Sequence, residues 1–243
     1  MNLTLDDSEK FLDSFIQPIS RITDGGILKI EPDKISSLIA TGDGTIIVYG
    51  EYAQSFPVTE PLVLNIPDLK KLHKLLSLIG TDINLVVDTN SVAYSSDTVR
   101  FKYHLYENGI IKTPSLNMAK LKTINFDGSF TITSERLRNL LKGSTLNPDI
   151  SKVYITFNGG KVFAELTDKA RHNVDSYATI IAEDYTNAAY ATSIPINFEI
   201  IRLLSASKIA QFNVKLATKL NVFNFELISE KVSLNYIVSA LTN

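Results

Sequence analysis

The sequence contains no cysteine and no long apolar run. Without cysteine the chain can form no disulfide, no thiolate metal site and no cysteine nucleophile, which is consistent with a reducing cytoplasm. No apolar run approaches the ~18 residues that a membrane-spanning helix needs. The first ten residues, MNLTLDDSEK, lack a basic start followed by an apolar stretch, so we expect no secretory signal. These absences predict a cytoplasmic protein that has no membrane partner.

An overall excess of positive charge is also missing. The chain has 24 lysine and arginine residues against 26 aspartate and glutamate residues, a net charge of −2. This balance argues against a protein that wraps nucleic acid by bulk charge. A local basic patch is still compatible with it.

Catalytic and metal-binding signatures are absent from the sequence as well. It has no P-loop, no dinucleotide fingerprint and no G-x-S-x-G motif. The three histidines, His73, His104 and His172, are scattered, and no two of them have metal-ligand spacing. The acidic residues between positions 6 and 13 are explained mainly by capping of a helix N-terminus. We therefore predict no catalytic residue, no metal site and no cofactor, and a protein that is not an enzyme.

Four segments have the periodicity of amphipathic helices: residues 5–20, 66–80, 133–144 and 196–207. Each is preceded by a short strand-like segment and followed by three alternating, strand-like segments. Equivalent points in the helices lie roughly 60–67 residues apart, so the chain is predicted to contain four structurally similar repeats. The fold class is therefore α+β. A stretch without a clear pattern between the second and third repeats predicts an N-terminal domain (1–108), a connector (109–123) and a C-terminal domain (124–243).

Positive charge is concentrated in the second, third and fourth helices. With Lys208 just after the last one, these segments carry eight cations against three acids, a net +5, which leaves −7 on the rest of the chain. A single lysine-rich helix face is ordinarily just a solvated surface. Three such faces at equivalent positions in successive repeats predict a continuous surface for a polyanion if the repeats pack side by side.

The sequence resembles the sliding clamps, the ring-shaped processivity factors of replicative DNA polymerases, and most of all those of T-even-type tailed phages. The resemblance rests on the repeat order over essentially the whole chain and on two local matches, residues 1–30 and the final strand NYIVSAL (235–241). The fourth helix, FEIIRLLSASK (198–208), also resembles the basic helix of the eukaryotic and archaeal clamps.

The resemblance implies a DNA-clamp fold of two similar domains, with helices on one face of antiparallel sheets and three copies closed into a ring. It implies four partners: duplex DNA held without sequence specificity, a second and third copy of the chain, a DNA polymerase and an ATP-dependent clamp loader. If the chain is phage-encoded, it is expected in the host cell cytoplasm.

Three groups of site residues follow from the helix charges and the resemblance. The residues expected to face DNA are Lys10, Lys70, Lys71, His73, Lys74, Arg136, Arg138, Lys142, Arg202 and Lys208. Those expected at the subunit interface are Val99, Phe101, Tyr103, Tyr177, Thr179 and Ile181. Those expected in a pocket for partner peptides are Ile110, Ile111, Leu116, Met118, Tyr236 and Val238, of which half could be ordinary core residues.

Two other classes of protein stay open at this point. A β-rich structural oligomer of a phage particle would explain the strand content, but not why cations prefer the helices. A hydrolase with dispersed carboxylates has no support beyond the presence of acidic residues.

Overall fold

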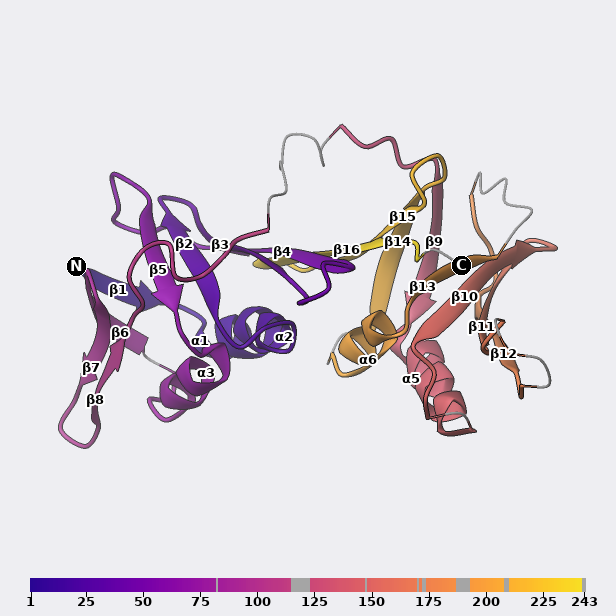
Figure 1. The fold of residues 1–243 in the computed structure, drawn as a ribbon. Coiled ribbons are helices and arrows are strands. Elements are labelled where there is room, and N and C mark those ends of the chain that lie inside the picture. Colours follow the sequence, from indigo (N-terminus) through magenta and orange to yellow (C-terminus); the bar gives the residue numbers. More distant parts are fainter. Residues whose placement is uncertain are drawn as a thin grey trace. The chain divides into compact units, whose positions relative to one another are not determined.

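The computed structural model describes residues 1–81, 83–114, 123–146, 148–169, 171, 174–186, 193–207 and 210–241. These residues form two compact units (Figure 1). The N-terminal unit contains residues 1–42, 48–114 and 228–234. The C-terminal unit contains the described residues of 43–47, 115–227 and 235–243. Strands β4 (Ile46–Ala53) and β16 (Val232–Ser239) therefore each contribute residues to both units.

The N-terminal unit contains the four-stranded antiparallel sheet β1-β6-β7-β8 and the strands β5-β2-β3-β4, which are one half of an eight-stranded sheet. The other elements of this unit are β1 (Asn2–Leu5), α1 (Ser8–Lys10), a π-helical segment (Phe11–Ile16), α2 (Gln17–Ser20), β2 (Gly26–Glu31), β3 (Lys34–Ala40), β5 (Leu62–Ile66), α3 (Leu69–Ser77), β6 (Ile83–Asp88), β7 (Ser91–Ser95) and β8 (Arg100–His104). Figure 1 shows the helices of this unit together on one side of its strands.

The C-terminal unit repeats this arrangement, with the four-stranded sheet β13-β10-β11-β12 and the strands β9-β14-β15-β16, which are the other half of the eight-stranded sheet. Its other elements are β9 (Gly128–Thr133), α5 (Ser134–Gly143), a 3₁₀ turn (Ser144–Leu146), β10 (Lys152–Asn158), β11 (Lys161–Leu166), β12 (Tyr177–Ala182), β13 (Ile194–Asn197), α6 (Glu199–Ser205), β14 (Gln211–Ala217) and β15 (Val222–Ile228). Its two helices also lie on one side of its strands (Figure 1).

The strand orders confirm the α+β fold class and the repeat. In each unit the strand before the first helix pairs with the first of the three strands that follow the second helix. The strand before the second helix likewise pairs with the first of the three strands that follow the first helix. Consequently β8 of the N-terminal unit is the counterpart of β16, and β4 is the counterpart of β12. Of these four strands, β8 and β12 end their sheets, whereas β4 and β16 do not.

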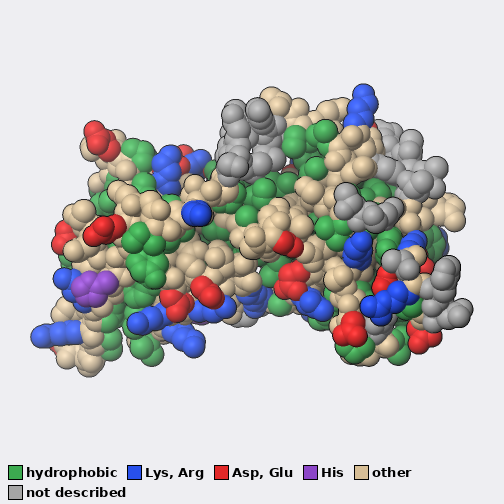
Figure 2. Space-filling model, viewed as in Figure 1, with side chains coloured by type: hydrophobic (Ala, Val, Ile, Leu, Met, Phe, Trp, Pro, Cys, Tyr) green, Lys and Arg blue, Asp and Glu red, His purple; other side chains and the backbone are tan. Residues whose placement is uncertain are grey.

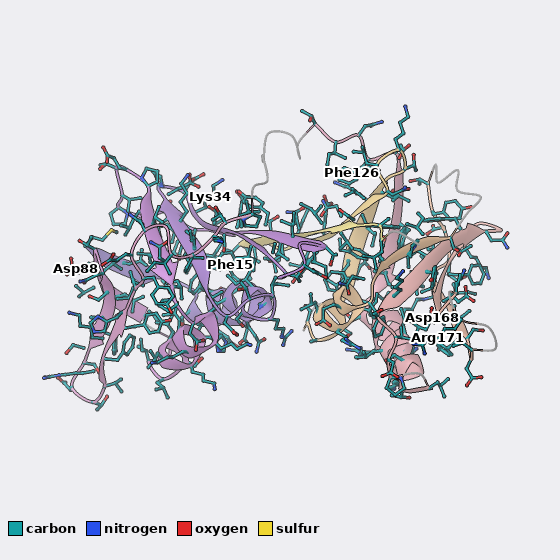
Figure 3. All side chains as sticks on the ribbon, viewed as in Figure 1. Phe15, Lys34, Asp88, Phe126, Asp168 and Arg171 are labelled. Carbon is teal, nitrogen blue, oxygen red and sulfur yellow. The ribbon has the colours of Figure 1, made fainter. Side chains whose placement is uncertain are left out.

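The first helix departs from a regular α-helix. It begins after Asp7, whose carboxylate accepts a hydrogen bond from the backbone N–H of Lys10 at 3.0 Å. Phe11–Ile16 is π-helical, a wide turn that is rare outside functional or strained segments. The apolar residues of this segment are buried, and Figure 3 shows Phe15 pointing into the interior between the helices and the strands.

The alternating strands and the amphipathic helices together form the core of each unit. In α3 the buried side chains are Leu69, Leu72 and Leu76, and in α5 they include Leu137 and Leu140. Burial of each such leucine contributes about 1.5–3 kcal/mol. With one stripe committed to the core, the other residues of both helices are left for solvent or for a ligand.

Candidate nucleic-acid interface

Helix α3 presents three lysines opposite its buried leucine stripe. Asp68 caps the helix, and its carboxylate accepts a hydrogen bond from Lys71 N at 2.8 Å. Lys70 lies 3.1 Å from the Asp24 carboxylate. Lys71 and Lys74 are exposed, and neither forms an ion pair within the described residues. These two lysines are the free positive charges of the N-terminal unit's helical face.

Helix α5 divides its cations in the same way. Arg138 and Lys142 are exposed and have no ion-pair partner in the described part of the chain. Arg136 is turned toward β12 instead: its guanidinium donates to the Ile180 carbonyl at 2.9 Å and to the Glu183 carboxylate at 2.6 Å. The hydrogen bond from Arg136 to Glu183, and after it one from Lys161, lowers the pKa of the Glu183 carboxyl.

Helix α6 offers less charge than the sequence pattern predicts. Five of its seven residues are buried. Its cation Arg202 lies 3.0 Å from Glu199 one turn earlier and stacks on the Phe198 ring at 5.0 Å. Lys208, which we expected to face DNA, lies outside the described residues.

The two remaining predicted DNA-facing residues lie beside acidic groups. Lys10 is half-buried, 3.7 Å from Glu230. His73 Nε2 is 3.9 Å from an Asp13 oxygen, so this side chain lies between α3 and the first helix. Neither residue is an open cation, although both lie on the helical side of the unit.

Several cations on the strands, by contrast, are neutralised by neighbouring acids. Three such pairs have nitrogen–oxygen distances under 3 Å: Lys29–Glu31 (2.7 Å), Lys34–Glu51 (2.6 Å) and Lys215–Glu226 (2.9 Å). The hydrogen bond with Glu51 raises the pKa of Lys34. In Figure 2, lysine and arginine side chains gather along the helical side of the N-terminal unit, with a few acidic side chains among them. Among the described residues of the helices and strands, exposed cations without an ion-pair partner thus lie on α3 and α5, and also on β8, which carries Arg100 and Lys102.

Two strands predicted at the subunit interface lie at sheet edges. β8 ends one sheet of the N-terminal unit and β12 ends one sheet of the C-terminal unit. On β8, the Phe101 side chain is partly exposed. Tyr103 is buried, and its hydroxyl accepts from Asp68 N at 2.9 Å and donates to Asp68 O at 2.8 Å. Val99 precedes β8 in a tight turn. On β12, Tyr177 and Thr179 are partly exposed and Ile181 is buried.

The backbone of β8 is directed outward at alternate residues. Leu105 N donates to Asn90 O at 2.8 Å, and Ser96 N donates to Val99 O at 2.9 Å. Hydrogen-bonded pairs alternate along an antiparallel ladder. In this register the backbone groups of Arg100, Lys102 and His104 therefore point to the open side of the sheet. That row of donors and acceptors can pair with another strand.

Comparison with known proteins identifies the architecture. No family model matches the sequence, and no curated protein matches it. The structure is similar to PCNA of A. fulgidus, solved with the C-terminal region of FEN-1 (11% identity, TM-score 0.75, covering 100% of this chain and 98% of that one). It is also similar to PCNA of Entamoeba histolytica (14%, 0.74, 99% and 98%) and to the PCNA2–PCNA3 complex of Sulfolobus tokodaii (10%, 0.70, 99% and 99%).

The chain has the DNA-clamp fold. Both units and the whole repeat order take part in the match, because coverage is complete or nearly so for each of the three structures. At identities of 10–14% few residues are shared, so the likeness lies in the order and arrangement of the helices and strands. These three structures do not test the predicted relation to phage clamps, which stays a prediction.

Of the six residues predicted to line a pocket for partner peptides, four lie in the described part of the chain. Ile111 lines a hollow with Ile27 and Leu38, and Ile110 is 56% exposed. Tyr236 and Val238 are 2% and 0% exposed. They are inward-facing residues of β16, and their assignment to a pocket stays a prediction. Leu116 and Met118 lie outside the described residues.

The described residues contain no group of three or more histidine, aspartate or glutamate side chains placed to hold a metal ion. None of the helices in the same part of the chain is long and apolar enough to cross a membrane. The candidate sites of this chain are the exposed cations of α3 and α5 and the edge strands β8 and β12.

Proposed function

We propose that this protein is a sliding clamp: three copies close head to tail into a ring that encircles duplex DNA and tethers the replicative DNA polymerase. Two clamp units per chain give six units in such a ring. The protein acts as a scaffold without catalysis of its own. Attachment to DNA is topological, and sequence plays no part in it.

The observation that carries this proposal is the difference between two pairs of equivalent edges. β4 and β16 are paired: Ala53 N donates to Lys231 O at 2.7 Å in the N-terminal unit, and Ser239 N donates to Thr45 O at 3.3 Å in the C-terminal unit. Their counterparts, β12 and β8, end their sheets without a further strand in the described residues. The same pairing between copies would join β12 of one chain to β8 of the next.

Head-to-tail pairing of this kind uses two different surfaces of each chain. Such an interface forms a closed ring when its rotation closes and a filament when it does not. Closure also removes the exposed edges, which otherwise promote aggregation. The S. tokodaii structure, a complex of two clamp chains, supports association between chains of this fold.

The attraction to DNA comes from the unpartnered helix cations Lys71, Lys74, Arg138 and Lys142. A closed ring needs little intrinsic affinity, because the duplex cannot leave sideways. Phosphate contacts made by mobile side chains provide a weak, screened attraction that is indifferent to base sequence. Three of the four are lysines, which carry a point charge on a flexible stem, and this suits sliding better than rigid bidentate pairing.

Partner proteins are expected at the connector. The A. fulgidus clamp was solved with a peptide from FEN-1, and we infer that this chain likewise binds peptides of its polymerase beside Ile110 and Ile111. An ATP-dependent clamp loader is needed to open the ring on DNA. A phage origin, the host cytoplasm as location, and functional domains bounded at 1–108, 109–123 and 124–243 are further parts of the proposal.

The mass of the protein in solution tests the assembly. One chain has a mass of 26.9 kDa, so three give about 81 kDa by light scattering coupled to gel filtration. A stable mass of one or two chains at all concentrations, or a series of growing filaments, would contradict the ring.

A further inference from the structure

Two tight turns in the chain are equivalent. Ser96–Val99 joins β7 to β8, and Ser229–Val232 joins β15 to β16. In each, the serine N–H donates to the valine carbonyl, at 2.9 and 2.8 Å, and the serine hydroxyl contacts the valine backbone. The second residue of the turn is acidic in both: Asp97 in the first and Glu230 in the second. Asp97 and Glu230 therefore occupy the same place in the repeat.

Two cations are equivalent in the same sense. The Asp7 side chain accepts from Lys10 N, and the Thr133 side chain accepts from Arg136 N at 3.3 Å. Both cations are therefore the third residue after the N-cap of the first helix in their unit. Lys10 and Arg136 therefore start from matching positions in the repeat.

Inside the N-terminal unit, the first helix spans the β4–β16 pair. Lys10 lies 3.7 Å from Glu230 in the turn that begins β16. A Cβ added at Gly50 of β4 would lie 2.8 Å from Leu234 of β16 and 3.0 Å from the Phe15 ring. The helix, the edge strand and the strand paired with it are thus in direct contact at this junction.

In the C-terminal unit, the equivalent helix is already fastened to its edge strand. Arg136 donates to Ile180 O and Glu183, beside an irregularity in the β11–β12 register that leaves a strand group free for such a bond. At the other end of α5, an added Cβ at Gly143 would lie 2.3 Å from the Tyr177 ring. The Arg136 guanidinium is therefore directed toward the edge of β12, where a second copy would pair.

We propose that Arg136 is a subunit-junction residue that pairs with Asp97 of the next copy, as Lys10 pairs with Glu230 within the chain. Asp97 is exposed and has no partner within the described residues, so its charge is available. The inference rests on the proposed ring and moves Arg136 from the DNA surface to the interface.

Charge reversal in the full chain tests this pairing. Arg136→Glu alone and Asp97→Arg alone should each raise the concentration at which the ring dissociates, by about tenfold or more, because each places like charges at the junction. The double variant should return this concentration to within about threefold of the original protein, as measured by sedimentation. Arg138→Glu, the same change two positions further along α5 on its exposed face, should leave dissociation unchanged and should gain nothing from Asp97→Arg.

Arg136→Glu also disturbs Glu183 within its own chain, so a further variant separates the two effects. If Glu183→Lys restores association of Arg136→Glu while Asp97→Arg does not, Arg136 acts only inside its own unit and the proposal is overturned. The proposal is also overturned if the original protein forms rings and none of the charge reversals changes the concentration at which they dissociate. Failure of the original protein to associate would instead overturn the proposed ring itself.

Discussion

At the residue scale, the helix cations fall into two groups. Lys71, Lys74, Arg138 and Lys142 have no ion-pair partner in the described residues, whereas Lys70, Arg136 and Arg202 lie close to a carboxylate. An exposed ion pair contributes little to stability but cancels much of the field that a nearby phosphate would feel. The free group should therefore dominate the attraction to DNA.

Replacing the four free cations with alanine should weaken retention on DNA and leave assembly intact. Each cation that contacts a phosphate adds about 0.9 to the slope of log affinity against log salt concentration. Direct binding of linear duplex, measured from 50 to 200 mM salt, should show a shallower slope in the variant. A matched control removes four cations elsewhere, Lys29, Arg171, Lys215 and Lys219, at the same cost in net charge. An equal loss in the control would contradict a role specific to α3 and α5.

Tyr52 makes the stability of the N-terminal unit sensitive to alkaline pH. It is fully buried, its hydroxyl donates to Asp7 O at 3.1 Å, and burial raises its pKa to about 12. A group whose pKa is raised by folding stabilises the protein below its unfolded pKa of about 10, and this stability is lost as pH rises toward 12.

The free energy of unfolding should thus fall by about 2–3 kcal/mol between pH 10 and 12 because of Tyr52 alone. Urea denaturation of the protein and of Tyr52→Phe isolates this contribution, since the other tyrosines are present in both. At pH 8 the variant should be less stable by about 1 kcal/mol for the lost hydrogen bond. The difference should shrink or reverse above pH 10. A difference that does not change with pH would show that Tyr52 does not ionise in this window.

The sequence predicted which residues lie on the outer face of each helix, because a period of 3.6 residues is visible in one segment alone. It did not predict which of them meet an acid from another element. Arg136 contacts Glu183, 47 positions later, and Lys70 contacts Asp24, 46 positions earlier. Nothing in the local pattern of either helix signals those partners.

At the element scale, the strands were the most predictable feature. Alternation of apolar and polar residues identifies a half-buried strand such as β6, and all sixteen strands of the described residues fall in segments that the sequence predicts as strand-like. Alternation alone could not decide whether Tyr236 and Val238 of the final strand serve the core or a pocket, and the structure shows that both are buried. The π-helical turn at Phe11–Ile16 has no such signature and was missed.

Strand β8 offers a direct test of edge pairing. The backbone N–H of Lys102 points to the open side of the sheet, so Lys102→Pro removes an outward donor without breaking the ladder to β7. We expect this variant to remain folded by circular dichroism but to lose the ~81 kDa species, whereas Lys102→Ala should keep it. Retention of the full assembly by the proline variant would argue that β8 is not the joining strand.

At the scale of the whole molecule, a closed ring makes retention on DNA largely independent of the affinity for phosphates. A protein held by phosphate contacts alone dissociates rapidly as salt rises, because counterions compete for each contact. A closed ring resists salt as long as its subunit junctions hold and the DNA has no free end. Retention should therefore depend on the topology of the DNA more than on the number of helix cations.

The most direct measurement compares nicked circular DNA with the same DNA made linear. After loading by the cognate clamp loader with ATP, the protein should stay on the circle through gel filtration at 200 mM salt and leave the linear form by sliding off its ends. Blocking both ends of the linear DNA with bulky proteins should restore retention. Equal retention on open linear and circular DNA, or none on either after loading, would contradict encirclement.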